Sequence, residues 1–176
     1  MKTMITLAAA MLVVFQAQAA ESAMPSRTEL KDCVIQEVLP GKNMTGAFVR
    51  FVHRGEPVEM LRAEVPGLSE RVELHSMAVK DGVMEMIPLT STRLEAGERV
   101  FRKGADHVML FDIDEKPAIG SKHTIRIYFS NQTVASCEAV VKSIHDVMQD
   151  AGIKGAAHGG HGGHGSKGDG HGGMSH

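Results

Sequence analysis

Residues 71–88 read RVELHSMAVKDGVMEMIP, and this stretch contains two short strand-like runs separated by a turn signal. The candidate strands are Arg71–Ser76 and Val83–Pro88, and the turn signal between them is Asp81-Gly82. The sequence therefore predicts a β-hairpin in the middle of the chain.

The same alternation of short strands and turns extends over residues 31–141. The further candidate strands are Asp32–Val38, Thr45–Val52, Val58–Val65, Arg99–Lys103, His107–Ile113, Thr124–Ser130 and Thr133–Val140. The last two are joined tightly at Asn131-Gln132, which predicts a second hairpin. Strands at this spacing, without long helical periods between them, predict an all-β sandwich or barrel of immunoglobulin-like or cupredoxin-like size.

The two ends of the chain have a different character. Residues 1–19 have a short positive start, an apolar run over Met4–Phe15 and the motif Ala17-Gln18-Ala19, which predicts a secretory signal peptide cleaved near Ala19. The apolar run is too short for a membrane-spanning helix, and no cysteine follows the cleavage site to carry a lipid. We therefore expect a periplasmic protein without a membrane anchor.

The remainder divides into an N-terminal segment over 20–30, a folded domain over 31–152 and a tail over 153–176. Val141, Ile144, Val147 and Met148 have the spacing of one short amphipathic helix that ends at Gly152. From Gly155 onward the tail offers nothing apolar to bury, so we expect it to be disordered. Its His-Gly-Gly repeats carry the candidate Cu(II) ligands His158, His161, His164, His171 and His176. The same imidazoles suit Ni(II) or Zn(II).

The composition favours a soft metal ion as the ligand. The 176 residues include 12 Met and 10 His but no Trp, and the formal charge is −2. A near-neutral chain lacks the basic face that a nucleic-acid-binding protein needs, so we expect no nucleic-acid partner. Thioether sulfur and imidazole nitrogen together are donors that Cu(I) accepts.

The two cysteines, Cys33 and Cys137, lie in strand-like segments at opposite ends of the folded region. In an oxidising compartment such a pair is more often a disulfide than a thiolate metal site. A thioredoxin-like redox role would need a Cys-x-x-Cys motif. We therefore consider Cys33–Cys137 a candidate disulfide.

Three short clusters combine histidine and methionine. In each, the donor residues are two apart and so share one face of a strand: His75 with Met77, Met84 with Met86, and His107 with Met109. The predicted hairpin would bring His75 near Met86, and Glu73 lies on the face of His75. A single methionine is usually core filling, but three such clusters within 35 residues favour a metal site.

The segments over 72–88 and 104–110 resemble the periplasmic PCu(A)C copper chaperones. The family signature is His, ten residues, Met, about twenty-one residues and then His-x-Met. Here His75 and Met86 are followed, after twenty residues, by His107-Val108-Met109. The resemblance implies a cupredoxin-like Greek-key β-sandwich and a Cu(I) site formed by His75, Met86, His107 and Met109, with Met77 and Met84 as additional candidates.

The resemblance also implies a role as a copper chaperone that is not an enzyme. Its partner would be the cytochrome c oxidase copper domain, with its dinuclear copper centre, or an assembly factor of that oxidase. A periplasmic copper buffer or resistance protein without a dedicated recipient is the main alternative.

Two other classes find less support in the sequence. A blue-copper electron carrier would need a thiolate with histidine and methionine, for which Cys137, His145 and Met148 are the candidates. A hydrolytic enzyme would draw on His53, His123 or His145, which are isolated and belong to no catalytic motif.

Overall fold

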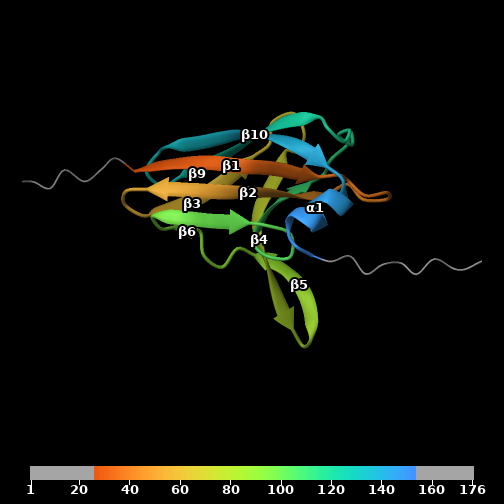
Figure 1. Ribbon diagram of the computed structural model, residues 1–176, viewed down its shortest axis with the longest axis horizontal. Helices are drawn as coiled ribbons and strands as arrows, with labels where there is room; N and C mark the ends of the chain where they lie inside the picture. The colour runs from red at the N-terminus through yellow and green to blue at the C-terminus, as the bar shows by residue number, and fades with distance from the viewer. Residues whose placement is uncertain (1–25, 154–176) are drawn as a thin grey trace, which may run out of the picture.

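Figure 1 shows the computed structural model, which describes residues 26–153. The elements in chain order are β1 (Arg27–Gln36), β2 (Thr45–Arg54), β3 (Val58–Glu64), β4 (Arg71–Lys80), β5 (Val83–Pro88), β6 (Arg93–Leu94), β7 (Gly97–Phe101), β8 (His107–Phe111), β9 (Lys122–Phe129), β10 (Val134–Lys142) and α1 (Ile144–Asp150). The predicted all-β fold with one short helix is confirmed.

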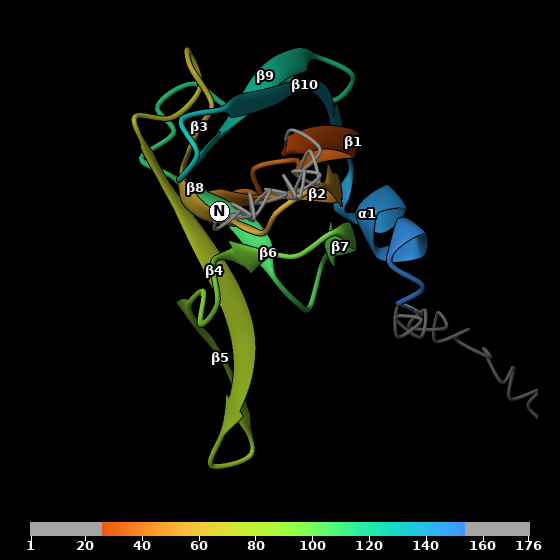
Figure 2. The same ribbon diagram turned by 90° about the vertical axis from the view of Figure 1, so that its left-hand side faces the viewer.

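The strands form a continuous hydrogen-bonded sheet that folds over into two layers. Their order is β5-β4-β8-β2-β1-β10-β9-β3-β6, and β7 also pairs with β2. One layer contains β4, β8 and β2, the other contains β10, β9 and β3, and β1 joins the two (Figure 2). The predicted hairpin between β9 and β10 is confirmed by their antiparallel pairing.

The core lies between the two layers. Side chains along β2 alternate between buried and half-buried, as expected for a strand with one face on the core. The buried ring of Phe51 packs edge-on against that of Phe101, with centroids 4.9 Å apart. From the other layer, Ile127 and Phe129 are also buried. Apolar contacts between the two layers therefore hold the sheets together.

A disulfide connects the first and last strands along the chain, which are neighbours in the sheet. β1 and β10 run parallel, with Val34 opposite Val140. Just before this pairing the ladder of β1 and β2 shifts register, and Asp32 has a φ of 50°. At that irregularity Cys33 is bonded to Cys137 of β10, with Cα atoms 6.4 Å apart. The connection closes a loop that contains most of the domain.

Several element boundaries differ from those expected from the sequence, and two of them are the start of β1 and the start of the helix. β1 starts at Arg27 rather than Asp32, because its first half pairs with the end of β2. Val141 belongs to β10, where it lies opposite Ile35, and the helix starts only after Ser143. The Ser143 hydroxyl accepts the backbone N–H of Asp146 and so caps α1.

The two-residue strand β6 has no counterpart among the expected strands. The predicted signal peptide and His-rich tail lie outside the described residues. Within residues 26–153, no helix is both long and apolar enough to cross a membrane.

The hairpin of β4 and β5 projects beyond the sandwich (Figures 1 and 2). Its turn has positive φ at both central residues, 52° at Asp81 and 79° at Gly82. These are the signs that a two-residue type I′ turn requires. β5 is the edge strand, and all but one of its six residues are exposed. The inner half of β4 remains in the sheet because β8 pairs with it.

Candidate metal centre

The register of three adjacent strands places the three clusters on one face of the sheet. Across β4 and β8, His75 lies opposite His107 and Glu73 lies opposite Met109. Across β4 and β5, Met77 lies opposite Met86. Residues directly opposite one another point to the same side, as do residues two apart on one strand. β4 is therefore the central strand of a continuous row of sulfur and nitrogen donors.

His75 presents one unpaired nitrogen to this face. Its side chain is buried, and its Nε2–H donates to Oε2 of Glu73 at 2.7 Å. The opposite ring nitrogen, Nδ1, is buried and has no hydrogen-bond partner. A buried polar atom without a partner carries a desolvation cost, which a bound ion would offset. The contact confirms that Glu73 lies on the face of His75.

His107 is held in the complementary tautomer. Its Nδ1–H donates to the carbonyl oxygen of Ala105 at 2.8 Å, which leaves the lone pair on Nε2. Burial lowers the pKa of His107, and the neighbouring His75 and Lys103 lower it further, against the raising effects of the Ala105 carbonyl and Asp106. The ring is therefore kept neutral, the form in which imidazole binds metal.

The two imidazoles lie near enough for one ion to contact both. Their ring centroids are 6.1 Å apart and their planes are inclined at 66°. Metal–nitrogen bonds of about 2 Å from each ring would bridge such a gap. Phe111 flanks the pair, with its ring centroid 5.8 Å from that of His75. Among the described residues no group of three His, Cys, Asp or Glu could hold a metal ion, so a site here needs methionine.

The methionines flank the imidazole pair and differ in exposure. Met109 is buried, with 5% of its surface exposed, and lies on the β8 side. Met86 lies on the β5 side and is 46% exposed. Met77 is half-buried opposite Met86, and Met84 is exposed nearer the turn. The arrangement combines a buried interior with one open side.

Gly46 is a residue of the site that the sequence did not single out. It lies on β2 directly opposite Met109. A Cβ at this position would lie 3.3 Å from Cζ of Phe48 and 3.8 Å from Cδ2 of His107. The absence of a side chain therefore lets the Phe48 ring lie close to the backbone beside the site. A glycine inside a strand is the only signal that could have indicated this close approach.

The other three histidines within residues 26–153 lie on other parts of the fold and have other surroundings. His53 is buried, accepts a hydrogen bond from Thr28 at Nδ1 and donates from Nε2 to the carbonyl of Glu56, both at 2.8 Å. His123 is within 3.2 Å of the Ser121 hydroxyl. His145, on α1, has a side chain that is 85% exposed. Because Cys137 is in the disulfide, it offers no thiolate to His145.

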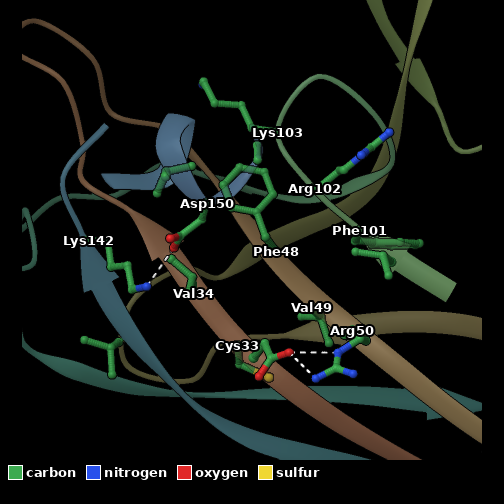
Figure 3. A pocket seen from close by; sticks show the side chains of 15 residues that line it. Cys33, Val34, Phe48, Val49, Arg50, Phe101, Arg102, Lys103, Lys142 and Asp150 are labelled. Carbon is green, nitrogen blue, oxygen red and sulfur yellow. Dashed lines mark hydrogen bonds and ion pairs between the residues drawn. The ribbon is translucent and has the colours of Figure 1, made fainter. Parts of the chain in front are cut away.

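A separate hollow of about 620 Å³ lies between β1, β2, β7, β10 and α1 (Figure 3). Cys33 and Phe48 contribute to its wall, and an ion pair between Lys142 and Asp150 spans one side. None of the candidate copper ligands in the described part of the chain lines it. Phe48 connects the two regions, because its ring also approaches Gly46 near His107.

Comparison with known proteins identifies the kind of domain and its family. The fold is similar to the copper-bound PCuAC domain from PmoF2, with 16% identity, 69% of this chain and 96% of that chain covered, and a TM-score of 0.51. It is also similar to the apo PCuAC domain from PmoF1, with 12% identity, coverage of 69% and 96%, and a TM-score of 0.53.

A third structure with this fold is CuI-DR1885 from Deinococcus radiodurans, with 21% identity, coverage of 70% and 83%, and a TM-score of 0.50. These structures confirm the cupredoxin-like β-sandwich and the resemblance to PCuAC domains in fold. The chain belongs to the LpqE-like lipoprotein family, whose model matches residues 28–141. No curated protein matches the sequence.

Proposed function

We propose that this protein is a copper chaperone that binds Cu(I) through His75, Met86, His107 and Met109. The observation that carries the proposal is the unpaired, buried Nδ1 of His75, aligned by register with the neutral His107. Both imidazoles are fixed by a hydrogen bond at the nitrogen that would not bind metal, an arrangement typical of histidine ligands. The similar PCuAC domain from PmoF2 is described as copper-bound.

The donor set supports Cu(I) over harder ions. Thioethers are soft, neutral ligands that an oxidising compartment does not consume as disulfides. The two rings contribute neutral nitrogen, so the ion would keep its single positive charge in a buried setting. The exposed Met86 gives an acceptor access to one ligand while the buried His75, His107 and Met109 retain the ion. This combination suits a protein that must release its cargo.

The proposal extends to the ends of the chain and to a recipient. After export to the periplasm, the tail histidines would bind Cu(II) as a second, separate site. The recipient would be the dinuclear copper centre of cytochrome c oxidase or an assembly factor. A buffer without a recipient would use the same ligands, so transfer distinguishes the two functions.

Competition with a Cu(I) chelator under reducing conditions tests the site. Met86→Ile and Met109→Ile should each weaken Cu(I) binding by more than about tenfold, equivalent to about 1.4 kcal/mol. Met44→Ile removes an exposed thioether from the connection before β2 and should bind as the wild type does. Unchanged affinity in both site variants would rule out the ligand assignment.

Copper transfer tests the chaperone role itself. The loaded full-length protein is mixed with an apo oxidase copper domain, the two proteins are separated at successive times, and transfer is followed by the copper content of each. Transfer that proceeds faster than from a small-molecule Cu(I) complex of equal affinity supports delivery. An equal or slower rate would favour the buffer.

A further inference from the structure

The projecting hairpin carries more methionine than the four-ligand site uses. Met84 and Met86 of β5 are 53% and 46% exposed, and Met77 of β4 is half-buried. His75, on the same face but nearer the sandwich, is only 9% exposed. Exposure therefore falls steadily from the turn of the hairpin toward the imidazole pair.

The methionines are confined to one face of this hairpin. Met77 lies opposite Met86, and Met84 lies two residues before Met86 on the same strand. The alternating positions on the other face, such as Ala78 and Glu85, carry no sulfur. Side chains directly opposite one another have Cβ atoms about 4.5–5.5 Å apart, and methionine has three rotatable bonds. The three sulfurs can therefore converge.

Core packing does not explain these residues. A methionine that fills a core is buried, whereas Met84 and Met86 lie on an edge strand with about half of their surface in solvent. Exposed thioethers are also open to oxidation. Val79 and Val83 at the same end are likewise exposed, so this end of the hairpin has no apolar partner within the described fold.

We propose that Met77, Met84 and Met86 form an all-thioether landing site for Cu(I), from which the ion passes to the imidazole pair. The inference rests on the proposed function and adds a second, weaker Cu(I) site to it. Met86 belongs to both sites, so it can remain bound while the other ligands change. The face contains neutral thioethers and no charged side chain between Met84 and His75, which favours a soft monovalent ion over Ca²⁺ or Mg²⁺.

The passage is a ligand exchange without oxidation or reduction. The bonds from copper to Met77 and Met84 break as bonds to Nδ1 of His75, Nε2 of His107 and the sulfur of Met109 form, and the bond to Met86 is kept throughout. Copper remains Cu(I), and no proton is released because both accepting nitrogens already carry lone pairs. Delivery to a recipient would follow the same steps in reverse order.

Methyl NMR of the methionines in the full-length protein tests the landing site directly. Under anaerobic, reducing conditions, the first equivalent of Cu(I) should shift the methyl signals of Met86 and Met109. The second equivalent should shift those of Met77 and Met84, which would hold this ion between two thioethers because Met86 is already bound to the first ion. If Met77 and Met84 remain unshifted while Met86 and Met109 respond, the landing site is wrong and the proposed function stands. If none of the four responds, the proposed function itself fails.

Uptake kinetics test the passage. The double variant Met77→Ile/Met84→Ile should take up Cu(I) from a chelator complex about tenfold more slowly, with its affinity for the first equivalent within about twofold of the wild type. Met44→Ile, the matched loss of an exposed thioether elsewhere, should keep the wild-type rate. An unchanged uptake rate in the double variant would overturn the passage. If the double variant loses as much affinity for the first equivalent as Met86→Ile does, Met77 and Met84 are ligands of the four-ligand site and not of a separate landing site.

Discussion

Replacing Glu73 separates the orientation of His75 from its role as a ligand. Oε2 of Glu73 accepts from Nε2 of His75 at 2.7 Å, while Nη1 of Arg71 lies 3.3 Å from Oε1 of the same carboxylate. Glu73→Ala frees the ring to adopt the other tautomer and to rotate. Glu73→Gln keeps an oxygen that can accept the same hydrogen bond. The two variants therefore differ in whether an acceptor remains to hold the His75 ring in place.

The expected loss of Cu(I) affinity depends on how exposed the Glu73–His75 contact is. Loss of a group that orients a metal-binding histidine typically weakens metal binding by about 10–100-fold. The Glu73 side chain is 42% exposed, so water can partly replace it, and the effect should lie near the lower end of that range. We expect Glu73→Ala to weaken Cu(I) binding by about tenfold, or about 1.4 kcal/mol, and Glu73→Gln to weaken it less.

Competition for Cu(I) against a chelator of known affinity measures the effect. Glu85→Ala is the matched control, because Glu85 is adjacent to Met86 but lies on the opposite face of the hairpin. Equal losses of Cu(I) affinity in Glu73→Ala and Glu73→Gln would show that the charge of Glu73 affects binding and that the orientation of the His75 ring does not. Tighter binding in Glu73→Ala would show that copper binds Nε2 of His75 in competition with Glu73, and would refute the assignment of Nδ1.

Two other predictions follow from the structure and a third from the sequence of the tail. Reducing the disulfide, or the pair Cys33→Ser/Cys137→Ser, should lower the free energy of unfolding by about 2–5 kcal/mol in denaturant titrations, since the bond closes a long loop. Folding lowers the pKa of His107, so on acidification the unfolded chain takes up a proton at a higher pH than the folded apo protein does. The free energy of unfolding should therefore fall as the pH drops below about 6.5 and level off once the pH is below the pKa of the folded state. Deleting the residues after Lys154 should abolish the Cu(II) bound per chain and leave the Cu(I) affinity nearly unchanged. Loss of Cu(I) binding in this variant would contradict the independence of the Cu(I) and Cu(II) sites.

Local signals in the sequence were enough to predict most of the strands and the hairpin that carries the site. Asp81-Gly82 indicated the turn, and the spacing of two residues indicated that His75 and Met77 share a face. The start of β1 was missed because its first half, from Arg27, is polar and depends on pairing with β2. A strand held mainly by a neighbour leaves little periodicity in its own sequence.

The geometry between distant strands could not be predicted. The pairing of His75 with His107 joins strands about thirty residues apart, and register is set by tertiary packing rather than by either segment alone. The tautomers depend on partners that only the fold identifies, namely Glu73 for one ring and the carbonyl of Ala105 for the other. The role of Gly46 likewise depends on the pairing of β2 with β8, which brings this residue beside the site.

Nitrogen-15 NMR of the imidazoles, with one equivalent of Cu(I) under reducing conditions, reports which ring nitrogens bind the ion. We expect large shifts at Nδ1 of His75 and Nε2 of His107, while Nε2 of His75 and Nδ1 of His107 keep their protons. Shifts confined to other histidines of the chain, with both of these rings unchanged, would contradict this assignment.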